Sequence, residues 1–207
     1  CNTNRCRIKF LDTNISFQDM NLMYNISDGV VLPSYAEGWG LSLTEAMMTG
    51  KMFIATVTGG MQDQMRFEDE NGDWITFSKD FPTNSTGKYK KHGPWCIPIW
   101  PTACMISGSP ATPYIYEDEI RIQDITKAIQ KLYDLGPDKR LDRGMKGYEW
   151  ANSEEAGFTA KQMGERIVDG IEKVFDKFTP VLNYRIIKIS DSDSDLNKIN
   201  TNIVWKN

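Results

Sequence analysis

Two glutamates, Glu37 and Glu45, enclose a short stretch of residues that could bind a charged and hydroxylated ligand. Gly38 and Gly40 allow backbone N–H groups to turn toward one point, and the start of a following helix would add partial positive charge there. Such a loop can bind an anion. The two carboxylates would repel a bare phosphate, but they can accept hydrogen bonds from hydroxyl groups. A nucleotide sugar, with phosphates at its centre and hydroxylated rings at both ends, fits this pattern.

Each of these residues also has a structural interpretation. Ser42 and Glu45 have the spacing of a capping box, in which both side chains satisfy backbone donors at the start of a helix. On spacing alone, this interpretation of Glu45 is favoured over a binding role. Glu37 could equally be a solvated loop carboxylate, and Trp39 could fill space in the core beneath the loop.

The elements around this loop follow the pattern of a parallel α/β sheet. Short apolar runs alternate with segments of helical spacing between residues 7 and 77, which is typical of repeated βα units. Strands are predicted over 7–11, 30–32, 52–56 and 73–77, and helices over 17–26, 42–49 and a short stretch from residue 61. The Val30–Leu32 run predicts a strand buried on both faces. The Glu37–Leu41 loop would then lie at its carboxyl end, where open parallel sheets bind ligands.

The second half of the chain departs from this alternation. Residues 78–116 hold six of the nine prolines, and we predict an ordered insertion because a structureless loop of that length is rare in a compact domain. Trp95 and Trp100 within it are expected to pack as ordinary core aromatics. Apolar residues recur at helical spacing in three later segments, over 125–132, 141–148 and 153–178.

Composition excludes several classes of partner. The 207 residues carry a net charge of -4 and a pI near 5.1, so neither a nucleic acid nor an anionic membrane surface is the expected partner. There is no apolar stretch long enough to span a bilayer and no signal-peptide pattern, and we expect a cytoplasmic protein. The four cysteines lack metal-site spacing and predict free thiols, and His92 is the single histidine. We expect no metal and no cofactor.

The segment from Val30 to Gly60 resembles a known family. It is similar to the carboxy-terminal, donor-binding domain of retaining GT-B glycosyltransferases of the glycosyltransferase 4, or group 1, type. The resemblance rests on two glutamates eight residues apart, on the Gly-Trp-Gly-Leu sequence between them, and on the Gly-Gly turn downstream. It is close over residues 7–77 and loose over 121–178, and it hardly extends to the insertion or the end of the chain.

The resemblance implies a Rossmann-like parallel sheet flanked by helices and a role for each residue of the loop. Glu37 would be the catalytic-site carboxylate that binds hydroxyls of the donor sugar, and Glu45 would bind the ribose hydroxyls. The residues that would approach the sugar and the diphosphate are Gly38, Trp39, Gly40, Leu41, Gly59 and Gly60. Asp63 stands where the family usually has glutamate, which leaves the identity of the donor open.

The resemblance also implies that parts of the enzyme lie outside this chain. Residues 1–180 would form part of the donor-binding domain, with the insertion at about 78–116, and residues 181–207 would be a tail, a linker or the start of a further unit. The basic pair that stabilises the leaving diphosphate would precede residue 1. The acceptor site would belong to a missing amino-terminal domain, so His92 is not expected to be catalytic, and the fragment alone would be inactive.

The expected function is transfer of a sugar, with retention at the anomeric carbon, from a nucleoside diphosphate sugar to an unknown glycan, lipid or small-molecule acceptor. The alternative is a non-catalytic module that binds a nucleotide sugar or a glycan. An epimerase or a phosphorylase could share the same architecture, although no lysine has a recognisable pyridoxal phosphate context.

Overall fold

The computed structural model of the chain describes residues 7–76, 78–79, 81 and 87–179. The predicted tail, 181–207, lies outside these residues. Two compact units are distinguished, 1–164 and 165–207, and all of the sites discussed below lie in the first.

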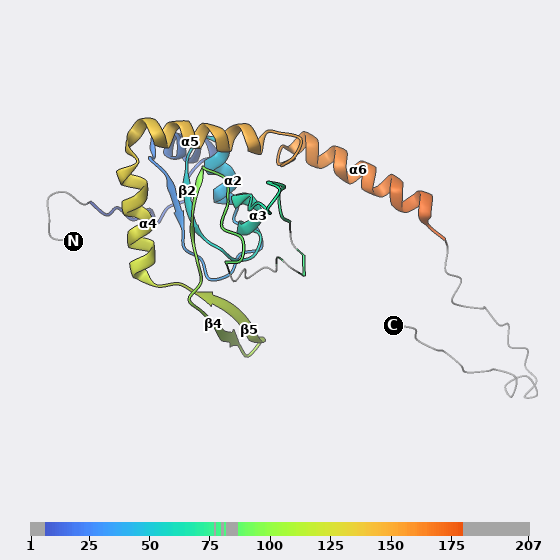
Figure 1. The fold of residues 1–207 in the computed structure, drawn as a ribbon, viewed down its shortest axis with the longest axis horizontal. Coiled ribbons are helices and arrows are strands. Elements are labelled where there is room, and N and C mark those ends of the chain that lie inside the picture. Colours follow the sequence, from blue (N-terminus) through green and yellow to red (C-terminus); the bar gives the residue numbers. More distant parts are fainter. Residues whose placement is uncertain (1–6, 77, 80, 82–86, 180–207) are drawn as a thin grey trace, which may run out of the picture. The chain divides into compact units, whose positions relative to one another are not determined.

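Helices and strands alternate as far as β3, after which two further strands and then three helices follow (Figure 1). In chain order, the elements are α1 (Phe17–Ile26), β1 (Val30–Leu32), α2 (Leu41–Met48), β2 (Phe53–Thr56), α3 (Met61–Met65), β3 (Cys96–Ile99), β4 (Ala103–Ser109), β5 (Thr112–Glu119), α4 (Ile122–Asp134), α5 (Gly136–Ala151) and α6 (Ala160–Lys177).

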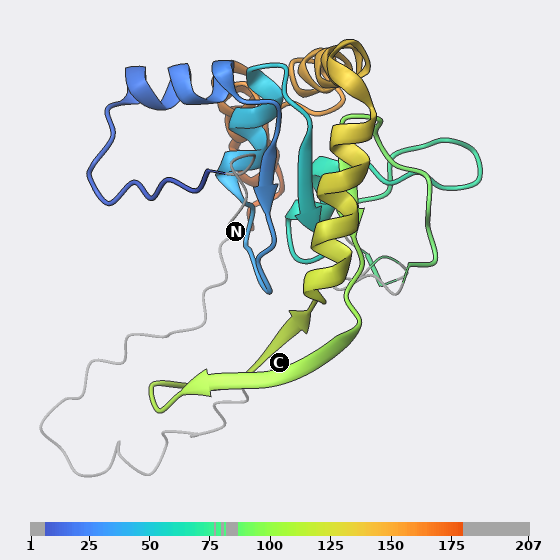
Figure 2. The same ribbon diagram turned by 90° about the vertical axis from the view of Figure 1, so that its left-hand side faces the viewer.

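The main sheet is parallel, with the strand order β1-β2-β3, and it separates two layers of helices. On one face, Phe53 and Ala55 of β2 share a buried cluster with residues of α2, α3 and α5. On the other face, Met52 and Ile54 pack with β3 and with α4, which crosses in front of the strands in Figure 2. The predicted Rossmann-like α/β arrangement, a parallel sheet flanked by helices, is therefore confirmed.

Most of the elements predicted before residue 66 are present. The first helix begins as expected, because the Ser16 hydroxyl accepts a hydrogen bond from the Asp19 N–H over 3.1 Å and caps α1. Strand β1 spans the predicted residues, 30–32. It lies at an edge of the described sheet, and Val31 is 40% exposed, so the expectation of burial on both faces is wrong for these residues.

Two predicted strands are not formed. Residues 7–11 pair with no strand among the described residues, and Phe10 is 90% exposed. An apolar run becomes a strand only where a neighbouring strand pairs with it. Of the strand expected over 73–77, the described residues form only an isolated antiparallel bridge between Glu68 and Trp74. Phe77 itself lies outside the described residues.

The segment 78–116 is not wholly an insertion, because it contains β3, a strand of the main sheet. The N–H groups of Phe53 and Val57 donate to the carbonyls of Trp95 and Ile99, so the backbone of these two residues points toward β2. Because backbone groups alternate in direction along a strand, the backbone of Pro98 points away from β2. Proline is tolerated there because no strand of the described residues needs its N–H. Trp95 is buried in the core, as predicted.

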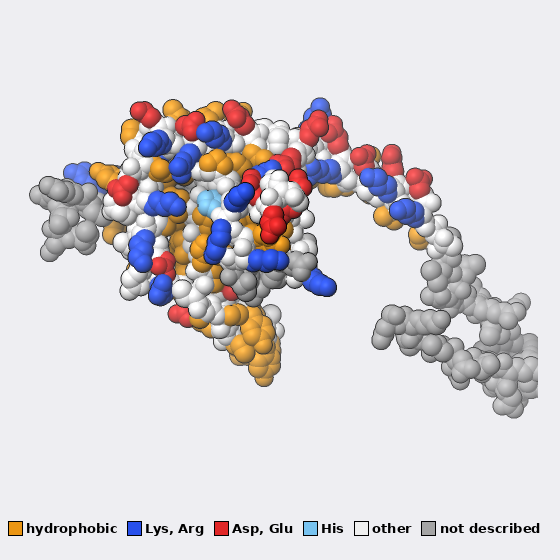
Figure 3. Space-filling view, in the orientation of Figure 1, with side chains coloured by type: hydrophobic (Ala, Val, Ile, Leu, Met, Phe, Trp, Pro, Cys, Tyr) orange, Lys and Arg blue, Asp and Glu red, His pale blue; other side chains and the backbone are white. Residues whose placement is uncertain are grey.

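Strands β4 and β5 pair antiparallel and form a hairpin that projects from the body of the unit (Figure 2). Apolar side chains gather on its outer part (Figure 3), where Ile106, Tyr114 and Tyr116 are each more than 60% exposed. The prolines and aromatic residues that suggested an insertion over 78–116 thus belong in part to β3 and in part to this hairpin.

The three later helices are present, with one change of boundary. Helix α6 begins at Ala160 rather than near residue 153, because Thr159 and Gln162 form the reciprocal side-chain and backbone contacts of a capping box. On α5, the predicted apolar stripe is partly exposed, and Gly144 and Gly147 are buried instead. None of the helices within the described residues is both long and apolar enough to cross a membrane.

Candidate functional site

The loops that follow β1 and β2 meet at the carboxyl ends of these strands. The Gly60 N–H donates to the Glu37 carbonyl over 3.2 Å. A Cβ atom on Gly59 would lie 1.9 Å from the Glu37 carbonyl oxygen, and one on Gly60 would lie 2.2 Å from the carbonyl oxygen of Gly38. Gly59 also has a φ of +52°, which favours glycine. The Gly-Gly turn is therefore required for the two loops to touch.

A buried glutamine holds the first loop in place. The Gln64 side-chain amide donates to the carbonyls of Trp39, over 2.5 Å, and Gly40, over 3.3 Å. Its own oxygen accepts from the Thr44 hydroxyl over 2.8 Å, and this hydroxyl accepts from the Trp39 indole N–H over 2.9 Å. The side chains of Gln64, Thr44 and Trp39 thus form a closed network, which reasoning from the sequence missed.

The predicted capping box at Ser42 and Glu45 is wrong. Helix α2 begins at Leu41, and its N-cap is Gly40, which has a left-handed φ of +78° and no side-chain cap. Ser42 therefore lies inside the first turn, where it cannot cap. The Glu45 carboxylate instead accepts a hydrogen bond from the Tyr24 hydroxyl of α1 over 2.6 Å. Burial, followed by this hydrogen bond, raises the pKa of Tyr24 well above its usual range.

The predicted site residues divide into two groups. Glu37, Gly38, Gly59 and Gly60 line one pocket of 490 Å³. The Glu37 carboxylate accepts a hydrogen bond from the Ser34 hydroxyl over 2.9 Å, which orients it on the loop. The four other predicted residues, Trp39, Gly40, Leu41 and Glu45, do not line this pocket.

The residues outside the pocket have different surroundings. The Trp39 ring packs edge-on against Phe158, with ring centroids 5.1 Å apart, so it supports the loop as a core aromatic would. Leu41 is 71% exposed at the start of α2. Asp63 lies in the first turn of α3, where burial raises the pKa of its carboxyl group.

The hairpin contributes a wall of the pocket that the sequence did not reveal. Cys104 of β4 and Tyr116 and Asp118 of β5 line it together with Glu37. The backbone N–H of Asp118 donates to the Tyr35 carbonyl over 3.0 Å, which joins the hairpin to the loop after β1. No local signal marks these residues, because their place depends on a contact between segments about 80 residues apart in the chain.

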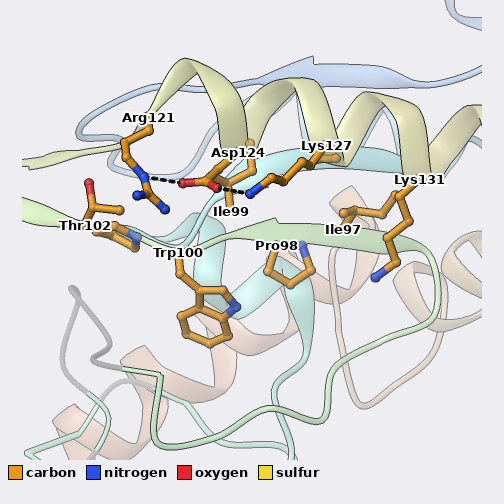
Figure 4. A pocket seen from close by; sticks show the side chains of 11 residues that line it. Ile97, Pro98, Ile99, Trp100, Thr102, Arg121, Asp124, Lys127 and Lys131 are labelled. Carbon is orange, nitrogen blue, oxygen red and sulfur yellow. Dashed lines mark hydrogen bonds and ion pairs between the residues drawn. The ribbon is translucent and has the colours of Figure 1, made fainter.

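A second depression lies between β3 and α4, and it has the opposite charge (Figure 4). Arg121 and Lys127 approach the Asp124 carboxylate to 2.9 and 3.6 Å, and Lys131 lies further along α4. The Trp100 ring forms part of the opposite wall and contacts the Lys90 ammonium, 4.3 Å from the ring centroid. None of the predicted site residues lines this depression.

His92 belongs to neither pocket. Its Nδ1 lies 2.8 Å from the Gly93 carbonyl, and its ring packs edge-on against Phe67. Burial lowers the pKa of His92. In the part of the chain that the structure describes, there is no group of three or more His, Cys, Asp or Glu side chains that could hold a metal ion, and the described cysteines, Cys96 and Cys104, are free thiols.

Comparison with known families agrees with the geometry of the two loops. Residues 8–80 match the sequence model of the family described as glycosyl transferases group 1. The matched segment covers about a third of the chain and includes both glutamates and the Gly-Gly turn. No curated protein matches the chain at a significant level. The matched segment contains β1, α2, β2 and α3, the elements that carry the two loops.

Proposed function

We propose that the chain supplies the donor-binding part of a retaining glycosyltransferase, which transfers a sugar from a nucleoside diphosphate sugar to an acceptor. The observation that carries the proposal is the junction of the two loops. Four residues expected to contact the sugar, drawn from loops about 20 residues apart, line one pocket at the carboxyl ends of β1 and β2. This edge of a parallel sheet is where such folds bind ligands.

Glu37 is the residue that binds the sugar in this proposal. Glu37 lines the pocket, and its carboxylate is already oriented by the Ser34 hydroxyl, so it can accept further hydrogen bonds from sugar hydroxyls. A hydrogen bond to a charged carboxylate is stronger than one between neutral groups.

Glu45 binds the ribose hydroxyls in this proposal. It is exposed on α2, and its contact with the Tyr24 hydroxyl leaves lone pairs free on both carboxylate oxygens. The start of α2 lies between the two glutamates in the sequence, and no side chain caps it. Its partial positive charge favours the diphosphate that joins the sugar to the nucleoside.

Catalysis in this proposal is electrostatic and needs no metal or further cofactor from this chain. The carbon–oxygen bond to the diphosphate breaks with positive charge on the sugar, and the departing diphosphate carries the negative charge. The basic groups that stabilise the diphosphate, and the acceptor site, would come from a segment upstream of residue 1. A cytoplasmic location is proposed on the basis of the sequence.

Calorimetric titration of the chain with nucleoside diphosphates and nucleotide sugars tests the proposal. Glu45→Gln is expected to weaken binding of both kinds of ligand, because both contain the ribose. Glu37→Gln is expected to weaken only nucleotide-sugar binding, roughly tenfold or more, because it removes a charged acceptor for the sugar. Glu149→Gln, at an exposed position of α5, serves as the control and should change the affinity for neither kind of ligand.

Turnover is then measured after joining the chain to its upstream half. Nucleotide release in the presence of an acceptor should fall with both substitutions. If turnover and donor binding are unchanged in Glu37→Gln and Glu45→Gln, the proposed function is wrong. Donor binding without any turnover in the joined protein would instead support the non-catalytic binding module.

A further inference from the structure

Asp118 is a mostly buried residue whose carboxylate has no hydrogen-bond or ion-pair partner among the described residues. The residue is only 6% exposed, yet its side chain makes no hydrogen bond or ion pair with the residues that the structure describes. Its carboxylate oxygens are not among the fully buried polar atoms that lack a partner, so they are open to the pocket, where water supplies their hydrogen bonds until a ligand displaces it. Because Asp118 lines the pocket that contains Glu37, a ligand in that pocket can supply them.

The position of Asp118 is fixed by its backbone. Its N–H donates to the Tyr35 carbonyl over 3.0 Å, and in the hairpin it pairs with Cys104, which lines the same pocket. At the base of the hairpin, the Thr102 N–H also donates to the Glu119 carbonyl over 2.8 Å. Asp118 therefore lies at the anchored end of the hairpin, where a side chain can be held at a defined place against a ligand.

The charge of the pocket is of one sign. Glu37 and Asp118 are the only ionisable side chains in its lining apart from the thiol of Cys104 and the phenol of Tyr116, and no lysine, arginine or histidine of the described chain lines it. Two carboxylates accept hydrogen bonds from hydroxyl groups, but they repel a third carboxylate. Such a site selects by repulsion as well as by attraction.

From these observations we infer that the β4–β5 hairpin completes the donor-sugar pocket, and that Asp118 is a specificity-determining residue that selects a neutral, hydroxyl-rich sugar over a uronic acid. Asp118 accepts hydrogen bonds from hydroxyls of the sugar that Glu37 holds from the opposite loop. Tyr116 adds an aromatic wall against which the apolar face of a sugar ring can pack. The inference rests on the proposed function, because it assumes that this pocket holds the donor sugar.

Calorimetry on the 207-residue chain tests the inference with two matched sets of probes. One set is UDP, UDP-glucose and UDP-glucuronic acid, and the other is GDP, GDP-mannose and GDP-mannuronic acid. In the set that binds, the native chain should bind the neutral sugar donor at least tenfold more tightly than the acidic one. Asp118→Asn should weaken binding of the neutral donor roughly tenfold and strengthen binding of the acidic donor. Binding of the nucleoside diphosphate should not change.

Two further variants control for folding and position. Glu117→Gln changes the neighbouring residue of β5, which does not line the pocket, and it should bind like the native chain. Tyr116→Ala removes a side chain that is 68% exposed, so the fold should survive, and it should weaken the sugar donors but not the nucleoside diphosphates. This second variant keeps the hairpin testable if Asp118→Asn does not fold.

The failures of the two proposals are distinguishable. Native affinity of Asp118→Asn for the neutral donor, or equal binding of neutral and acidic donors by the native chain, overturns the inference and leaves the proposed function standing. Unchanged sugar binding in Tyr116→Ala likewise removes the hairpin from the donor pocket. Absence of binding to every nucleotide and nucleotide sugar of both sets, or binding that neither Glu37→Gln nor Glu45→Gln weakens, overturns both proposals.

Discussion

At the scale of single residues, the candidate site depends on side chains that touch no ligand. Gln64 is fully buried and ties the backbone of Trp39 and Gly40 to α3, while Thr44 closes the network from α2. The carboxylate of Glu37 is therefore held by a loop whose carbonyl groups are already paired inside the protein. An exposed loop of the same sequence without this glutamine would have to order itself each time a ligand bound.

Replacing Gln64 by leucine should destabilise the fold and disturb the loop. The apolar side chain removes the donors to two buried carbonyl groups, and each unsatisfied group costs about 1–3 kcal/mol. Urea denaturation of Gln64→Leu is expected to show a free energy of unfolding lower by roughly 2–4 kcal/mol. The exposed Gln130→Leu on α4 is the matched control and should change it by less than about 0.5 kcal/mol. Equal stability of the two variants would contradict the role of the network.

At the scale of elements, the sequence predicted those helices and strands that are formed by interactions between residues close together in the chain. Helix α1 with its Ser16 cap, α2, and the strands around Val30 and Phe53 follow from spacing within a few residues. The Glu37 loop and the Gly-Gly turn were predicted as one site, and the structure brings Glu37, Gly38, Gly59 and Gly60 into one pocket.

The elements that were missed depend on distant parts of the chain. Strand β3 carries Pro98, which argues against a strand until its place at the edge of the sheet is known. The run around Phe10 has the composition of a strand, but no strand in the described part of the chain pairs with it. Asp118 could not be assigned to the site, because only the contact of β5 with the Tyr35 carbonyl brings it there.

Helix α5 packs its backbone, rather than an apolar stripe, against the core. A Cβ atom on Gly144 would lie 2.0 Å from the carbonyl oxygen of Gly50, in the turn that joins α2 to β2. Gly144→Ala should therefore lower the free energy of unfolding by about 1–3 kcal/mol through overpacking, although alanine favours a helix in isolation. Gly164→Ala in α6 is the control, since a Cβ atom there meets nothing within 4 Å and alanine should not destabilise it. Thermal denaturation followed by circular dichroism measures both, and a stabilised Gly144→Ala variant would disprove the close packing.

At the scale of the whole molecule, the two depressions of the first unit are lined by side chains of opposite charge. The pocket of Glu37 and Asp118 carries carboxylates, whereas the depression beside α4 carries Arg121, Lys127 and Lys131 against a single carboxylate, that of Asp124. A modest net charge of -4 thus conceals regions of opposite sign.

The free energy of unfolding should fall as the pH drops below about 6.5, the ordinary pKa of histidine. Burial, with smaller contributions from Lys131 and Arg143, lowers the pKa of His92 in the folded chain, while Glu68 opposes this change. The unfolded chain therefore binds a proton at His92 at a higher pH than the folded chain does. The resulting decrease in the free energy of unfolding is at most about 1.4 kcal/mol per pH unit. Above pH 7 both states are neutral at this position and the effect is absent.

Urea denaturation between pH 7.5 and 5.5 measures this dependence. His92→Gln cannot take up the proton, so its profile should lack the part of the loss that His92 contributes. The difference between the two profiles isolates His92 from the carboxyl groups, including Asp63, whose raised pKa has the opposite effect on stability at low pH. Parallel profiles for the native chain and the variant would contradict the assignment.

Pro98 has a consequence for how this sheet meets other chains. It lies at the centre of β3 on the side away from β2, where it offers no N–H to an approaching strand. An extended segment of another molecule would find no donor at the middle of this edge, so the edge resists the strand-to-strand stacking that nucleates aggregates.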